Sequence, residues 1–113
     1  MGMTDQVASM REALKRQTLE RFERMRARSE LVVFSDHFGE QRRARVADMT
    51  DRQIHRVVAN GEVRKVGPGK YNHWKVEVKG RSAGDLVTVV CEVRDDMLVL
   101  ITCWEGTGDG PLE

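Results

Sequence analysis

The chain has 113 residues, of which 40% are hydrophobic and 33% are charged. This length suits a single domain with its own core, and no apolar run approaches the roughly 20 residues that span a bilayer. The first residues carry no apolar stretch of the secretory type. These features exclude a transmembrane protein and predict a cytoplasmic one without a membrane partner.

The charge is unevenly distributed, although the net charge is only +1. Residues 11–28 contain seven basic and three acidic side chains, and residues 61–81 contain six and two. Residues 82–113 contain one basic and seven acidic side chains. A protein with separated basic and acidic surfaces is suited to bind a polyanion through the basic surface. Arginine outnumbers lysine fourteen to five, which suits phosphate because a guanidinium binds it with two parallel hydrogen bonds. A GC-rich genome would enrich arginine equally.

The two cysteines predict no metal chemistry. Cys91 and Cys103 lie in apolar segments, and the chain has no Cys-x-x-Cys or Cys/His ligand spacing. We therefore expect no zinc site, no other metal and no cofactor, and two free thiols in a reducing cytosol.

A long helix is predicted from Thr4 to about Ser29. Its apolar positions recur at spacings of three and four and share one face: Val7, Met10, Leu14, Thr18, Phe22 and Met25. A helix of this length in so small a domain either wraps the core or pairs with a partner.

Three further elements are expected before the sheet. The run 31–34 predicts a short strand or extended link, and residues 36–46 predict a second helix. A third helix begins at a capping box formed by Thr50 and Gln53, and Asn60-Gly61 is expected to end it in the left-handed conformation.

Strand patterns then fill the rest of the chain, over residues 62–66, 73–79, 86–93 and 97–104. In the second of these, His73, Lys75 and Lys79 alternate with an apolar face. The last two are apolar on both faces, which predicts helices two and three on one face and either the first helix or a second copy on the other. A two-residue loop at Asp95-Asp96 would place Cys91 opposite Leu100 and direct Cys103 to the other face.

The predicted fold is α+β, with N-terminal helices followed by a four-stranded antiparallel meander. Residues 1–30 form the N-terminal helix, residues 31–105 form the α+β domain, and the Gly-rich residues 106–113 form a flexible tail.

Two histidines are candidates for acid–base chemistry. His37 opens the second helix, where the helix dipole favours neutral imidazole, and a neutral imidazole can act as a general base. His73 lies beside Lys70 and Lys75, which suits metal-free RNA cleavage because the cations would stabilise the phosphorane. Either histidine could equally be an ordinary solvated side chain.

The layout of residues 31–105 resembles the domain-of-unknown-function 4258 family. The resemblance is carried by Phe34-Ser35-Asp36-His37, Gln41, Arg45, Ile54–Val58, Asn60-Gly61-Glu62-Val63 and Leu98–Thr102. Gln41 stands where the family usually has arginine. The resemblance implies a fold like that of the RelE toxins, small cytoplasmic ribonucleases of bacterial and phage toxin–antitoxin systems.

Two functional hypotheses follow. In the first, a RelE-like protein binds RNA or the ribosome and cleaves RNA without metal. His37 or His73 is then the base, Arg45 is a catalytic cation, and Arg42, Lys70 and Lys75 contact phosphate. Its partner would be an antitoxin. In the alternative, the protein is a non-catalytic module of a phage or mobile element that forms a homodimer or docks on a host protein through its first helix.

Overall fold

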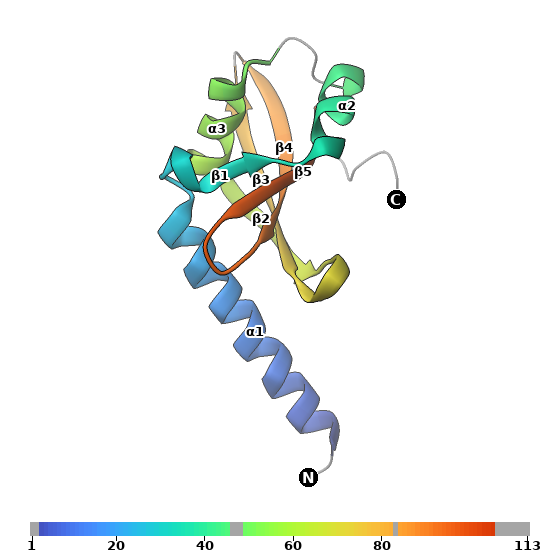
Figure 1. Cartoon of the computed structure of the whole chain (residues 1–113). Helices are drawn as coiled ribbons and strands as arrows, with labels where there is room; N and C mark the ends of the chain where they lie inside the picture. The colour runs from blue at the N-terminus through green and yellow to red at the C-terminus, as the bar shows by residue number, and fades with distance from the viewer. Residues whose placement is uncertain (1–2, 46–48, 83, 106–113) are drawn as a thin grey trace.

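The computed structural model describes residues 3–45, 49–82 and 84–105 (Figure 1). The helices are α1 (Met3–Met25), α2 (Asp36–Arg45) and α3 (Asp51–Asn60). The strands are β1 (Val32–Phe34), β2 (Glu62–Pro68), β3 (Trp74–Ser82), β4 (Asp85–Val93) and β5 (Leu98–Glu105). The tail predicted at 106–113 lies outside the described residues. None of the described helices combines the length and apolarity that a membrane span requires.

The α+β class is confirmed, but the sheet is mixed and has five strands, in the order β1-β5-β4-β3-β2. The predicted meander forms its antiparallel part. The extra strand, β1, runs parallel to β5 and places Val32 opposite Leu98. Immediately after β1, the Ser35 N–H donates to the carbonyl of Leu100 over 3.0 Å. The sequence signals the short apolar run, but its pairing depends on the free edge of β5, which only the folded sheet supplies.

Helices α1 and α3 cover the same face of the sheet, so the alternative that placed the first helix on the opposite face is wrong. Phe22 and Met25 of α1 join the buried residues of α3 in one core cluster, together with Val76 and Val78 of β3. Helix α2 packs mainly against β5, and its Phe38 belongs to the same core cluster. The reason is the direction of the chain after α1, which turns through residues 29–31 into the parallel strand at the edge of the sheet.

The predicted start and end of α3 are confirmed, but the left-handed conformation expected at its end is wrong. The Thr50 side chain accepts the Gln53 N–H over 3.2 Å, and the Gln53 side chain accepts the Thr50 N–H over 2.8 Å. Gly61, however, has an extended backbone with φ −73° and ψ 170°. Glycine is needed there for space, since a Cβ atom would lie 2.5 Å from the Val57 oxygen and 2.6 Å from Val78 Cγ1.

The β4–β5 hairpin has the expected loop but carries a bulge. Arg94 N–H donates to the Met97 carbonyl across Asp95-Asp96, and Cys91 lies opposite Leu100. The register then shifts between Val90 and Cys91, so Ile101 is an extra residue on β5. Cys103 therefore lies on the same core face as Cys91, and the prediction that it points to the opposite face is wrong. Among the described residues, neither cysteine forms a disulfide, and both are buried.

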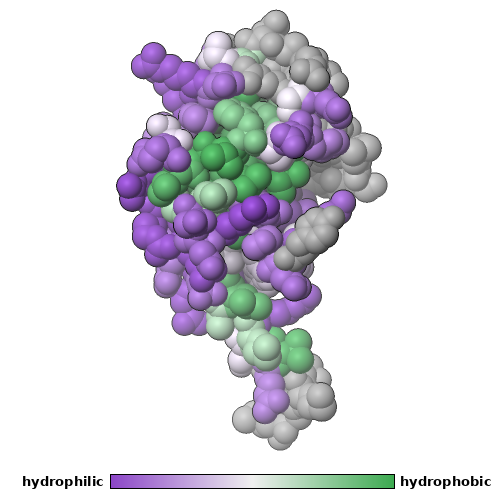
Figure 2. All heavy atoms as spheres, viewed as in Figure 1, coloured by the Kyte–Doolittle hydropathy of each residue, from purple (hydrophilic) through white to green (hydrophobic). Residues whose placement is uncertain are grey.

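Helix α1 divides into a packed half and a projecting half (Figure 1). Thr18, Phe22 and Met25 are buried against the sheet. Val7, Met10 and Leu14 continue the same stripe but are 53%, 64% and 41% exposed, and apolar surface is visible on the projecting part in Figure 2. The expectation of a packed first helix thus holds for its C-terminal half only.

Replacing Phe22 with alanine should reduce the free energy of unfolding by ~3–5 kcal/mol, because the ring is completely buried and its removal leaves a cavity. The same truncation at Val7, on the projecting half, should change stability by less than ~0.5 kcal/mol. Urea unfolding followed by circular dichroism measures both variants. Equal losses at the two positions would contradict the division of α1.

Candidate functional site

The strand β2 forms one edge of the sheet and is irregular. It pairs only with β3, and its register shifts between Val63 and Lys65, so Arg64 is the extra residue of a bulge. Arg64 and Lys65 are both exposed. Bulges and lysines are common on edge strands because they discourage pairing with another chain. Here they also bring positive charge to the edge.

An open cleft of about 560 Å³ surrounds this edge. Its lining comes from three elements, α1, β2 and β3, and consists of Lys15, Arg64, Lys65, Val66, Gly67, Lys75 and Glu77. Of these seven residues, four carry a cationic side chain and one a carboxylate. The lining of the cleft therefore has a net positive charge.

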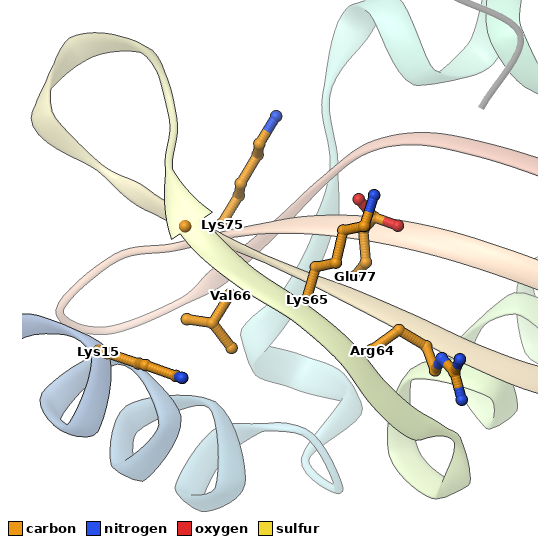
Figure 3. A pocket seen from close by; sticks show the side chains of 7 residues that line it. Lys15, Arg64, Lys65, Val66, Lys75 and Glu77 are labelled. Atoms are coloured by element: carbon orange, nitrogen blue, oxygen red, sulfur yellow. The ribbon is translucent and has the colours of Figure 1, made fainter. Parts of the chain in front are cut away.

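The cleft reaches both sides of β2 (Figure 3). Lys15 and Val66 lie on one side of the strand, whereas Lys65, Lys75 and Glu77 lie on the other. This arrangement follows from strand alternation, since Lys65 is paired with Glu77 and Val66 with Val76 of the core face. The edge is unobstructed at Gly67, where an added Cβ atom would meet nothing within 4 Å.

The ion pair that Arg64 of the cleft forms is an exposed one. Arg64 lies 3.3 Å from Glu62, with the two side chains 52% and 74% exposed, and such an exposed pair contributes little to stability. Lys15 and Lys75 are also exposed. A phosphate group that contacts Arg64 can therefore displace Glu62 with little loss of stability. Dissolved salt should weaken the attraction between such a phosphate and the exposed cations.

The position of α1, and with it Lys15, depends on Arg26. The Arg26 guanidinium donates to the carbonyls of Val58, over 2.9 Å, and Gly61, over 2.5 Å. It also lies 4.7 Å from the centre of the Phe22 ring. Cations are favourable at the C-terminus of a helix because the last carbonyls lack partners. Arg26 thereby fastens α1 to the junction between α3 and β2.

Of the three residues predicted in the basic stretch around β3, Lys75 lines the cleft, whereas Lys70 and His73 are not among its lining residues. Lys70 is exposed at the start of a 3₁₀ turn over Lys70–Asn72, between β2 and β3. His73 follows this turn and is half-buried. Its N–H donates to the Lys70 carbonyl over 3.2 Å, and its carbonyl accepts the Gly69 N–H.

The predicted residues of α2 are placed elsewhere. His37 is exposed, with Nδ1 3.8 Å from Glu40, and its helix packs against β5. Strand β4 lies between β5 and β3. The structure therefore does not bring His37 together with Lys75 in the cleft. The backbones of Arg42 and Arg45 belong to α2, but their side chains lie outside the described residues.

Sequence reasoning missed Lys15, Arg64, Lys65 and Glu77 as residues of one site. The basic surplus of residues 11–28 and 61–81 does point to both contributing segments. No local pattern, however, reveals that Lys15 of a helix lies against an edge strand some fifty residues later.

Two other reactive side chain types have structural roles. Burial raises the pKa of the Cys91 thiol to about 12, so the thiolate that a nucleophile requires is scarce at neutral pH. The imidazole of His55 stacks on the Phe34 ring, with 5.3 Å between the ring centres, and its Nε2 atom is buried. Among the described residues, no group of three or more His, Cys, Asp or Glu is arranged to hold a metal ion.

Comparison with known proteins returned no match to a family model, a curated protein or a solved structure.

Replacing Arg26 with alanine should lower the free energy of unfolding by on the order of 2–3 kcal/mol, because two carbonyls lose a charged donor. Arg24→Ala is the matched control, since Arg24 is exposed two residues earlier, in the last turn of α1, and it should change stability by less than ~0.5 kcal/mol. Urea denaturation gives both values. If the two variants lose the same stability, Arg26 does not fasten α1 to α3.

Proposed function

We propose that the protein binds single-stranded RNA at the cleft beside β2. The observation that carries this proposal is the convergence of four cations, Lys15, Arg64, Lys65 and Lys75, on one open cleft. Phosphate contacts by lysine and arginine supply most of the affinity of a nucleic-acid-binding protein that reads no sequence. Arg64 adds the planar fork that suits phosphate.

The shape of the site favours a single strand over a duplex. The cations lie on both sides of one edge strand, with an open position at Gly67 between them. A flexible single strand can bend over such an edge and place successive phosphates on the two sides. A stiff duplex would reach one side only.

The wider hypothesis retains the resemblance of residues 31–105 to the domain-of-unknown-function 4258 family. On that basis the domain is RelE-like, its RNA is presented alone or on the ribosome, and an antitoxin is its partner. Both the α+β class and the basic cleft are compatible with this hypothesis. The parallel strand β1 is an addition to the predicted meander.

Metal-independent cleavage requires a base within hydrogen-bond reach of the ribose 2′-hydroxyl. Of the two candidate histidines, His73 directly precedes β3 with an extended backbone and stands two residues before Lys75. His37 belongs to a helix that packs against β5. If RNA bound in the cleft is cleaved, His73 is therefore the better candidate.

Replacing Arg64 and Lys75 together with alanine should weaken binding of a fluorescent single-stranded RNA. The slope of log binding constant against log salt concentration should become less steep by about 1.4, at roughly 0.7 for each lost phosphate contact. Fluorescence anisotropy between 50 and 300 mM salt measures both. The matched control is Arg52→Ala with Arg56→Ala, which removes two exposed cations from α3 instead. Equal effects in the two double variants would mean that net charge, rather than the cleft, determines binding.

His73→Ala should leave RNA affinity within about twofold and reduce any cleavage by ~10²–10⁴-fold, since a general base contributes to rate rather than to affinity. His37→Ala should leave both unchanged. Cleavage of a labelled RNA in the presence of EDTA is followed on a denaturing gel. Binding without cleavage in the wild-type protein would mean a non-catalytic RNA-binding domain, and loss of activity in His37→Ala would transfer the role to α2.

The alternative hypothesis, a non-catalytic interaction module, is favoured by one observation: the exposed apolar stripe on the projecting half of α1. If the wild-type protein shows neither affinity for RNA at low salt nor cleavage, this alternative replaces the RNA-binding proposal.

A further inference from the structure

The cleft beside β2 contains a carboxylate that phosphate binding does not explain. Glu77 of β3 lines the cleft together with the four cations of the proposed RNA site, and it is half-buried. A carboxylate repels phosphate, so it lowers the affinity of a site that binds only the backbone of a nucleic acid. Its place among the cations points to contact with a different part of the ligand.

The strand register leaves the Glu77 carboxylate with unused hydrogen-bonding capacity. Its partner on β2 is Lys65, and its partner on β4 is Val90, which has no side-chain donor. Figure 3 shows Glu77 on the same side of β2 as Lys65 and Lys75. Within the part of the chain that the structure describes, the Glu77 carboxylate accepts no hydrogen bond and forms no ion pair. Both of its oxygen atoms can therefore accept hydrogen bonds from a ligand.

We propose that Glu77 recognises guanine in the RNA strand that occupies the cleft. The proposal rests on the RNA binding proposed above and adds the identity of a base. An ionised carboxylate offers two acceptor oxygens and no donor. Guanine presents two neighbouring donors, N1–H and the 2-amino group, on its Watson–Crick edge, and this edge is accessible in a single strand. The two groups can therefore form a pair of parallel hydrogen bonds, which is the kind of contact that discriminates between bases.

The other three bases match a carboxylate poorly. Adenine and cytosine each present one amino donor beside a ring nitrogen that is an acceptor, and uracil presents one N–H between two carbonyl oxygens. Each of them forms at most one hydrogen bond with Glu77 and brings a lone pair close to the second carboxylate oxygen. Guanine is therefore the base that this side chain selects.

The positions of the cations allow phosphate and base contacts at the same time. Lys75 lies two residues before Glu77 on β3, on the same face and roughly 7 Å away along the strand. Its side chain is exposed, and the flexible stem lets the ammonium reach a phosphate further from the sheet. A nucleotide whose phosphate contacts Lys75 can therefore direct its base toward Glu77. Lys15 and Arg64 line the cleft where neighbouring phosphates would follow.

Single-stranded RNAs that differ in one base test this selection. The full chain is titrated at low salt into short fluorescent oligouridylates that carry guanosine, adenosine, cytidine or uridine at the central position. The guanosine strand should bind at least about fivefold more tightly than the other three, which is the lower end of the discrimination that a bidentate contact supplies. Inosine keeps N1–H but lacks the 2-amino group, so an inosine strand should lose most of this preference.

Two matched substitutions assign the preference to Glu77. Glu77→Met keeps the length of the side chain and removes both acceptors. The guanosine preference should then fall below about twofold, while the affinity for the uridine strand rises because a like charge is gone. Glu62→Met is the control, since Glu62 is an exposed carboxylate beside Arg64 that does not line the cleft. It should raise the affinity for every strand and keep the guanosine preference. Circular dichroism should show the same fold for both variants, because neither carboxylate is fully buried.

The outcomes separate guanine recognition from RNA binding. Equal affinity for all four strands would overturn guanine recognition and leave the RNA-binding proposal intact. A guanosine preference that survives in Glu77→Met would also overturn it, because another group would then recognise the base. If the wild-type protein binds none of the strands at low salt, both proposals are wrong.

Discussion

The guanidinium of Arg26 connects α1, α3 and β2, two of which line the candidate cleft. Arg26 directly follows α1, and its side chain, 12% exposed, binds the carbonyls of Val58 near the end of α3 and of Gly61 just before β2. The buried contacts of Phe22 and Met25 then set the direction in which α1 leaves the sheet. Both the placement of Lys15 beside β2 and the projection of the N-terminal half of α1 follow from this anchoring.

The cationic cleft and the edge of the sheet have a common physical origin. An edge strand exposes unpaired backbone groups and needs protection from pairing with other chains. In β2 this protection comes from a bulge at Arg64 and from exposed cations. Protection alone would not require Lys15, which belongs to a helix, or Lys75, which belongs to the neighbouring strand. Their convergence on the same cleft is what suits a phosphate chain.

Much of the fold could be predicted because its signals are local. The capping box at Thr50, the alternation that buries Val76 and Val78, and the two-residue loop at Asp95-Asp96 all depend on a few neighbouring residues. The errors arise where distant segments meet. The bulge that returns Cys103 to the core, the parallel pairing of β1, and the extended backbone of Gly61 depend on which strand or helix lies alongside.

The sequence by itself determined the α+β class, the elements, the basic character of residues 11–28 and 61–81, and the apolar stripe of α1. These are properties of composition and periodicity, which any chain segment carries with it. Only the tertiary structure decided that Lys75 shares a cleft with Lys15 while His37 lies against a different strand. It also decided that the stripe is buried after Thr18 and exposed before it. Charge and periodicity are local, whereas proximity and solvent exposure are set by the packing of the whole chain.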